Sequence, residues 1–172
     1  IINPEKFIYS NILGTYSLLK TSIEFYNQLN IDKKEIFRFH HISTDEVYGD
    51  LPLLSITKIS EHNSKDYFTE KSSYKPNSPY SASKASSDHL VRAWSKTYEL
   101  PVTISNSSNN YGPYQHKEKL IPTIILNALK CSNIPIYGDG KNVRDWLFVD
   151  DHVKAINIIL KKGKIHSTYN IG

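Results

Sequence analysis

Apolar and polar residues follow one another along the chain with the periods of helices and strands. Apolar residues at helical spacings predict helices over residues 4–29, 79–98 and 119–132, and a fourth helix from Asp150 and Asp151 to about residue 161. Runs of β-favouring residues predict strands at 36–43, 101–105, 134–137, 146–149 and 167–171. Strands that alternate with amphipathic helices indicate an α/β fold with a largely parallel sheet.

Local signals mark the starts of the first two helices. Asn3 and Pro4 suit the cap and first turn of one helix, and Ser78 with Pro79 suits the other. Gly14 interrupts the first helix, and a glycine there costs about 1 kcal/mol relative to alanine. It marks either a point of close packing or a cost with no visible compensation.

Composition narrows the class of protein. Apolar residues make up 39% of the chain, enough for a core, and no apolar run approaches the roughly 18–20 residues that span a bilayer. The single cysteine, Cys131, excludes an internal disulfide and favours a reducing compartment, so we expect a cytoplasmic protein without membrane partners. Only three of the 21 basic residues are arginines, so the net charge of +4 indicates a lysine-rich surface and no nucleic-acid partner.

The most informative stretch follows the strand predicted from Ile36 to Ile42, where Thr44, Asp45 and Glu46 come directly after an apolar run. Ligands of parallel α/β sheets bind beyond the carboxyl ends of the strands. Adjacent carboxyls repel, and burial is expected to split their pKa values into one acid and one base. The alternatives are two solvated turn residues and a threonine that only satisfies backbone groups.

A second stretch, Tyr-Ser-Ala-Ser-Lys at 80–84, opens the helix 79–98. Tyr80 and Lys84 lie four positions apart and share one helix face. A nearby ammonium is expected to lower the phenol pKa from about 10, which suits a general base. The same spacing recurs at three other places, so what favours Tyr80 is its context: a helix start rich in small residues that follows a strand ending in a hydroxyl. Those places are Tyr16/Lys20, Tyr67/Lys71 and Tyr137/Lys141.

Two adjacent histidines and one arginine are further candidates for ligand binding. His40 and His41 are interpreted as strand packing, because no metal-ligand spacing accompanies them and no metal is expected. Arg144 has the planar donor group that matches diphosphate oxygens, and a salt bridge to Asp145 or Asp150 is the alternative.

Taken together, these motifs resemble the extended short-chain dehydrogenase/reductase family, and within it the 4,6-dehydratases that act on dTDP-glucose. The similarity covers nearly the whole chain and is weakest at 50–70. The matching blocks are Ser43–Gly49, Tyr80–His89, Ser108–Pro113, Glu118–Pro122 and Arg144–Leu147. The Thr-Asp-Glu triplet is the most specific of them, and Gln115-His116-Lys117 departs from the family pattern.

The resemblance implies a Rossmann-like doubly wound parallel sheet that holds NAD. Residues 1–113 are expected to form the C-terminal part of that domain, and 114–172 a partial nucleotide-sugar-binding region with some strands returning to the sheet. The chain begins at Ile1 and contains no methionine, so we expect an internal piece of a longer protein, with the glycine-rich phosphate loop before Ile1. Such a piece is expected neither to hold NAD nor to turn over alone.

The resemblance also implies a role for each residue. Tyr80, assisted by Thr44, takes the proton of the sugar 4-hydroxyl while NAD accepts hydride. Lys84 orients the cofactor ribose, Glu46 removes the C5 proton, and Asp45 protonates the departing 6-hydroxyl. Asn110 and Ser10 are expected near the cofactor, in addition to Tyr80 and Lys84. The implied substrate contacts, in addition to Thr44, are Asn109, Lys119, Leu120, Pro135, Ile136, Tyr137 and Arg144.

Partners and alternatives follow from the same comparison. Helices 4–29 and 79–98 are expected to pair with their copies in a homodimer. One alternative activity is that of another NAD-dependent nucleotide-sugar enzyme, a 4-epimerase or a UDP-glucuronate decarboxylase. The other alternative is a catalytically inactive member of the family that serves as a binding protein.

Overall fold

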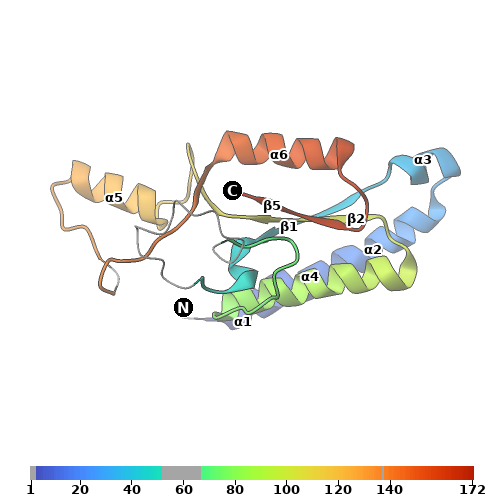
Figure 1. Ribbon diagram of the computed structural model, residues 1–172, viewed down its shortest axis with the longest axis horizontal. Coiled ribbons are helices and arrows are strands. Elements are labelled where there is room, and N and C mark those ends of the chain that lie inside the picture. Colours follow the sequence, from blue (N-terminus) through green and yellow to red (C-terminus); the bar gives the residue numbers. More distant parts are fainter. Residues whose placement is uncertain (1–2, 52–66, 137) are drawn as a thin grey trace.

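The main sheet consists of three parallel strands in the order β1-β2-β5. The computed structural model describes residues 3–51, 67–136 and 138–172. Strand β1 is Phe39–Thr44, β2 is Val102–Ser107 and β5 is Ser167–Ile171. Helices α2 (Gly14–Gln28) and α4 (Pro79–Tyr98) cover one face, and α6 (Val149–Lys162) covers the other (Figure 1). The predicted parallel α/β fold is confirmed.

The shorter elements lie around this three-layer body. Strands β3 (Asn109–Tyr111) and β4 (Trp146–Phe148) form a second parallel pair. A one-turn 3-10 helix, η2, directly follows β1. The remaining elements are α1 (Glu5–Phe7), the π-helix η1 (Ile8–Leu13), α3 (Ile31–Ile36), η2 (Asp45–Tyr48) and α5 (Leu120–Leu129).

The first predicted helix is continuous but contains a π-helical segment. The backbone N–H of Gly14 donates to the carbonyl of Tyr9, five residues earlier. A Cβ added at Gly14 would meet that carbonyl oxygen at 3.6 Å, an ordinary contact. Close packing therefore does not explain this glycine within the described part of the chain.

Two predicted strands were wrong in part. Residues 36–43 were expected to form a buried strand, but Ile36 ends helix α3 and is 78% exposed, and Ile42 within β1 is 47% exposed. The side chain of Asn30 accepts a hydrogen bond from the backbone N–H of Lys33, and this cap starts a short helix that the apolar pattern did not reveal. Residues 134–136 form no strand.

The central strand β2 is buried along its whole length. Alternate residues of a strand point to opposite faces, and Val102 and Ile104 join the core under α2 and α4. Asn106 is the next residue on that face and is only 1% exposed. The apolar core cluster consists of Leu19, Val91, Leu100, Val102 and Ile104.

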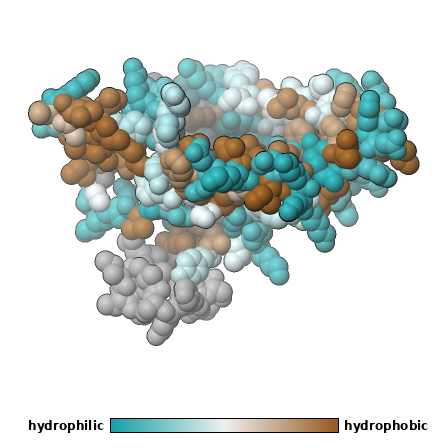
Figure 2. Space-filling view, turned by 90° about the horizontal axis from the view of Figure 1, so that it is seen from above, coloured by the Kyte–Doolittle hydropathy of each residue, from teal (hydrophilic) through white to brown (hydrophobic). Residues whose placement is uncertain are grey.

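Helix α5 lies apart from the three-layer body, at one end of the molecule (Figure 1). Its apolar side chains remain exposed and form a hydrophobic surface at the left end of Figure 2. The exposed residues are Leu120, Ile124, Ile125, Leu126 and Leu129. Among the described residues, no helix is both long and apolar enough to cross a membrane.

Gly49 ends the η2 turn in a backbone conformation (φ 87°, ψ −147°) that is essentially restricted to glycine. A Cβ there would overlap the carbonyl oxygen of Lys75, whose N–H donates to the carbonyl of Val47 over 2.9 Å. We expect Gly49→Ala to lower the free energy of unfolding by about 1–3 kcal/mol from backbone strain, and further through the overlap with Lys75. Urea denaturation measures this loss. Gly138→Ala is the control, because Gly138 also has a positive φ (63°), but an added Cβ would have no atom of the described residues within 4 Å, apart from the glycine itself and its chain neighbours. Equal losses in the two variants would show that the contact with Lys75 is unimportant.

Candidate active site

The turn that carries the two carboxyls is built by Thr44. Its Oγ1 accepts a hydrogen bond from the backbone N–H of Glu46 over 3.3 Å and thereby caps η2. The same hydroxyl donates to Asp45 Oδ1, also over 3.3 Å. Thr44 therefore does satisfy a backbone group, as one of the two interpretations held, but it also fixes the carboxyl of Asp45 at the carboxyl end of β1.

The pKa values of Asp45 and Glu46 are both raised. Burial is the main cause for each carboxyl, and the charge of Asp45 adds to the rise at Glu46. Asp145 raises the pKa of Asp45 further, whereas the hydrogen bond from Thr44 lowers it. The two pKa values thus shift in the same direction, and the predicted split into one acid and one base stays a prediction. The solvated-turn alternative is wrong for Asp45, which is half-buried, while Glu46 keeps contact with solvent.

The second half of the site begins at a well-defined helix start. Ser78 and Ser81 form a reciprocal capping box, and Pro79 occupies the first turn of α4. The small residues that follow allow η1 to approach closely. Asn11 Nδ2 donates to Ser83 Oγ over 2.9 Å, and Ser87 Oγ donates to the carbonyl of Asn11 over 2.6 Å.

Tyr80 lies close to the carboxyl pair. Its pKa is raised, first by burial and then by the negative charges of Glu46, Asp45 and Asp88. The ring packs edge-on against Phe7, with ring centroids 5.4 Å apart. The predicted lowering of this pKa by Lys84 was wrong for the chain as described, because burial and the charges of three carboxylates raise it.

Lys84 connects α4 to the end of β1. Its Nζ donates to the carbonyl oxygen of Ile42 over 2.8 Å, two residues before Thr44. Burial lowers the pKa of Lys84, and the charge of Asp88 opposes that shift. An ammonium has three protons, so two of its donors make no hydrogen bond to the residues that the structure describes and can serve another ligand. The structure therefore brings Thr44, Asp45, Glu46, Tyr80 and Lys84 together.

Sequence reasoning assigned no role to a buried polar group behind this site. The carboxyl of Asp88 is fully buried, accepts a hydrogen bond from the Tyr74 hydroxyl over 2.7 Å, and lies 3.2 Å from His41 Nε2. Arg92 donates to the same Tyr74 hydroxyl over 2.9 Å. Burial and the charge of Asp88 raise the pKa of Tyr74 well above its ordinary value. The spacing of four residues after Lys84 is the signal that would have identified Asp88.

The two adjacent histidines belong to the structure of the sheet. His40 Nδ1 lies 2.9 Å from Thr103 Oγ1, and its Nε2 lies 3.1 Å from Ser105 Oγ. Burial lowers the pKa of His40, with smaller contributions from His41 and His152. Both ring nitrogens therefore bond to the neighbouring strand, and the interpretation of His40 as strand packing is confirmed.

The charges of Arg144 and Lys119 act on Glu46, since both lower its pKa against the effect of burial. Lys119 is the N-cap residue of α5, and the exposed Arg144 donates to the carbonyl of its neighbour Val143 over 2.7 Å. Among the described residues, Arg144 forms no ion pair with Asp145 or Asp150, so the salt-bridge alternative is wrong.

The other residues predicted to bind substrate or cofactor make local hydrogen bonds or are exposed. Asn109 donates its backbone N–H to the carbonyl of Asp145, and Asn110 Nδ2 donates to the carbonyl of Ser108, just beyond the end of β2. Ser10, on η1, donates through its Oγ to the carbonyl of Lys6 in α1. Leu120, Pro135 and Ile136 are exposed, and no hydrogen bond or ion pair in the described ranges links them to the η2 turn. Tyr137 lies outside the described residues.

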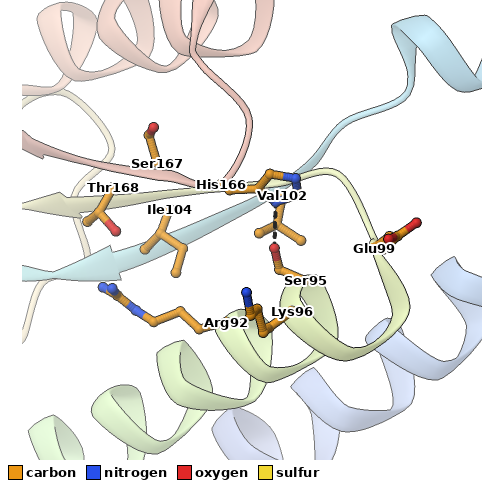
Figure 3. A pocket seen from close by; sticks show the side chains of 9 residues that line it. All are labelled: Arg92, Ser95, Lys96, Glu99, Val102, Ile104, His166, Ser167 and Thr168. Carbon is orange, nitrogen blue, oxygen red and sulfur yellow. Dashed lines mark hydrogen bonds between the residues drawn. The ribbon is translucent and has the colours of Figure 1, made fainter.

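A cavity of about 590 Å³ lies elsewhere, between the C-terminal half of α4 and the start of β5 (Figure 3). Val102 and Ile104 form its apolar wall, and Arg92 and Lys96 reach toward it from α4. It includes none of the predicted site residues. Val102 and Ser167 begin their strands, so this cavity is at the opposite end of the sheet from Thr44.

Comparison with known proteins identifies the family. Residues 1–172 match the family model described as GDP-mannose 4,6 dehydratase, and the chain belongs to that family. It is 55% identical over 172 residues to dTDP-glucose 4,6-dehydratase of Salmonella typhimurium, and 57% identical over 166 residues to that of Haemophilus influenzae. It spans 47% and 46% of the lengths of these relatives, about half in each case.

Solved structures show the same fold. A dTDP-glucose 4,6-dehydratase from Streptomyces venezuelae with NAD bound matches with a TM-score of 0.83 and 41% identity, covering 99% of this chain and 47% of that one. The dTDP-glucose 4,6-dehydratase from Bacillus anthracis in complex with NAD matches with a TM-score of 0.77 and 46% identity. The match covers 94% of this chain and 46% of that one. A UDP-glucuronic acid 4-epimerase from Bacillus cereus matches with a TM-score of 0.79 but only 28% identity. The match covers 96% of this chain and 46% of that one. The expected Rossmann-type fold is thus confirmed.

Proposed function

We propose that this chain forms the catalytic part of an NAD-dependent enzyme that dehydrates dTDP-glucose to dTDP-4-keto-6-deoxyglucose. The observation that carries this proposal is the Asp45–Glu46 pair, held on a capped turn beside Tyr80 and Lys84. Elimination of water needs one group that removes a proton from carbon and another that protonates a leaving hydroxyl. The relatives of 55–57% identity support the same activity by their names.

The residues present fit a nicotinamide cofactor. The two donors left on Lys84 can bond the ribose hydroxyls, and Tyr80 stands one helical turn before it. When bound here, NAD would supply a hydride acceptor for C4 of the sugar and afterwards a hydride donor for C6. A positively charged ring beside Tyr80 would also oppose the carboxylates that raise the pKa of this phenol in the chain alone. We place Asn110 and Ser10 at the cofactor as well.

The chain's own residues then move the protons. Tyr80 takes the proton of the sugar 4-hydroxyl, and the Thr44 hydroxyl turns its single proton from Asp45 Oδ1 to the same oxygen. The ketone formed at C4 acidifies the proton on C5, which Glu46 removes and, after water has left, returns to C5 when C6 takes up hydride. Asp45, whose raised pKa favours its protonated form, gives its proton to the C6 hydroxyl, and water leaves. The sugar has the same oxidation level at the end as at the start, apart from the lost water.

The positive charges beside the turn suit a nucleotide diphosphate. Arg144 and Lys119 lower the pKa of Glu46, so their charges act at the site, and guanidinium groups bind diphosphate oxygens bidentately. We propose that both residues hold the diphosphate. We also assign to the substrate site, on the family resemblance alone, Asn109, Leu120, Pro135, Ile136 and Tyr137.

The direct test is to express the protein from its full reading frame and incubate it with NAD and dTDP-glucose. Formation of the 4-keto-6-deoxy sugar, followed by NMR, supports the proposal. Inversion at C4 without loss of water would indicate a 4-epimerase, and binding without turnover would indicate an inactive family member. We propose further that residues 1–172 alone do not turn over, since the chain spans 47% of its relatives. A cytoplasmic location is consistent with the single exposed Cys131.

We also propose a homodimer in which η1, α2 and α4 pair with their copies. A largely apolar groove of about 520 Å³ runs between η1 and α4 on the outside of the molecule, lined by Ile8, Ile12, Pro79 and Ala82 among others. Ile8 is 47% exposed, and a hydrophobic side chain in such a groove is a suitable contact for a second copy.

We expect Ile8→Glu to weaken the dimer by about 10–100-fold, because burial of one aliphatic side chain contributes about 1.5–3 kcal/mol. Sedimentation analysis over a range of concentrations measures the change. Ile158→Glu is the control, since Ile158 is 59% exposed on α6, on the other face of the sheet. If Ile8→Glu leaves the dimer unchanged, or both variants weaken it equally, the proposed interface is wrong.

A further inference from the structure

Two phenols and an amide form a hydrogen-bonded bridge beneath the candidate site. Asn106 Nδ2 donates to the Tyr48 hydroxyl over 2.8 Å and to the Tyr74 hydroxyl over 3.3 Å. Tyr48 and Tyr74 also pack edge to face, with ring centroids 5.3 Å apart. Both protons of a single amide group are thus used to join two aromatic side chains.

The position of this amide is unusual for a polar side chain. Asn106 follows Val102 and Ile104 on the apolar face of β2 and is 1% exposed. A buried amide is destabilising unless it is hydrogen-bonded, and an aliphatic residue would continue the core at this place. The two bonds that Asn106 Nδ2 donates compensate for part of this cost, whereas Asn106 Oδ1 is buried with no hydrogen-bond partner among the described residues.

Each phenol leads to a different half of the site. Tyr48 is the last residue of η2, the turn that begins with Asp45 and Glu46, and its hydroxyl donates to Asn170 Oδ1 over 2.8 Å. Tyr74 donates to the buried carboxyl of Asp88, which lies on α4 one turn after Lys84 and two turns after Tyr80.

We propose that Asn106, Tyr48 and Tyr74 are positioning residues that fix the Asp45–Glu46 turn relative to Tyr80 and Lys84 on α4. This inference rests on the proposed dehydratase function. None of the three residues touches the reacting atoms. They act through the backbone of η2 on one side and through Asp88 on the other.

The bridge matters most for the second part of the reaction. Oxidation at C4 uses Tyr80 and Thr44. Elimination also needs Glu46 placed at C5 and Asp45 placed at the C6 hydroxyl of the sugar that Tyr80 holds. Tyr48→Phe keeps the ring, which stacks on Phe68 at 5.1 Å, but removes the bonds to Asn106 and Asn170. The Asp45–Glu46 turn is then no longer fixed relative to α4. A displacement of its carboxyls by about 1 Å costs on the order of 100-fold in rate.

The test compares two reaction phases in the protein expressed from its full reading frame. In single turnovers with dTDP-glucose, we expect Tyr48→Phe to slow elimination by about 10–100-fold while oxidation at C4 and KM change by less than about threefold. Reduced nicotinamide then accumulates and is measured by its absorbance. Tyr169→Phe is the matched control, because its hydroxyl accepts a bond from the Lys164 N–H over 2.6 Å at the other end of the sheet. Equal slowing of both phases, or no slowing in Tyr48→Phe, overturns the proposal.

A second measurement tests the bridge without substrate. The unfolding free energies of Tyr48→Phe, Tyr74→Phe and the double variant form a double-mutant cycle. Since both hydroxyls share the amide of Asn106, the effects must be non-additive, and additive effects contradict the bridge. If the unaltered protein does not dehydrate dTDP-glucose, the proposed function fails even where this coupling is present, so the two failures are distinguishable.

Discussion

Replacing Tyr80 with phenylalanine is expected to lower kcat for dehydration by about 10²–10⁴-fold, the usual contribution of a general acid–base group. The ring and its edge-on contact with Phe7 remain, so the packing of α1 on α4 is retained. Only the hydroxyl that accepts the proton of the sugar 4-hydroxyl is lost. Because that transfer accompanies the first step, reduced nicotinamide is not expected to accumulate in single turnovers.

Tyr16→Phe is the matched control for this variant. Tyr16 also has a lysine four residues later, Lys20, and its ring contacts Trp94 edge-on at 5.9 Å. It lies on α2, so loss of its hydroxyl is expected to leave kcat within about twofold of the unaltered protein, as for surface substitutions in general. A Tyr80→Phe enzyme as active as Tyr16→Phe would exclude Tyr80 as the base.

The pH dependence of Tyr80 follows from its surroundings. Its pKa is raised by burial and by Glu46, Asp45 and Asp88, so the free chain holds the phenol protonated at neutral pH. The base form is favoured when a positive charge enters the site. We therefore interpret Lys84, bonded to the Ile42 carbonyl, mainly as a cofactor ligand, and less as the group that ionises Tyr80.

The sequence predicted the parts of the fold that depend on local signals. Ser78 and Pro79 marked the start of α4, and the final strand was predicted over 167–171, where β5 lies. Ile36 was misassigned because its apolar side chain suggested a strand, whereas the Asn30 cap starts a helix that leaves it exposed. Periodicity alone does not separate these outcomes for short apolar runs.

The candidate site was predictable in its residues but not in its electrostatics. Neighbours in sequence, such as Asp45 and Glu46, were identified from their place at a strand end. The direction of the Tyr80 pKa shift depends first on the burial of the phenol and then on its nearness to Glu46 and Asp45, and both require the tertiary structure. The bridge through Asn106 joins residues 58 positions apart, which no spacing rule connects.

Glu46→Gln and Asp45→Asn are each expected to lower the rate of water elimination by about 10²–10⁴-fold. Unlike Tyr80→Phe, both variants keep the groups for oxidation at C4, so reduced nicotinamide accumulates. An epimerase has no need of either carboxyl, and unchanged turnover in both variants would support that alternative. Glu46 acts as a base, and its pKa is raised above the ordinary value of 4.5. In the unaltered enzyme, activity is therefore expected to be lost as the pH is lowered, beginning at a higher pH than for an ordinary glutamate.

The same variants are expected to be more stable than the unaltered protein at neutral pH. A carboxyl whose pKa is raised on folding favours the folded state below its unfolded pKa, 3.8 for Asp45 and 4.5 for Glu46, and this contribution is lost as pH rises through the folded pKa. Asn and Gln stay neutral and retain it. Urea midpoints measured from pH 3 to pH 8 should therefore differ at the upper end and converge below about pH 4. A gain in stability that persists at pH 3 would come from packing, and no gain at pH 8 would mean that the two carboxylates are not held in an unfavourable environment. The expected pattern, less activity with more stability, is typical of acid–base residues that a fold holds against their electrostatic preference.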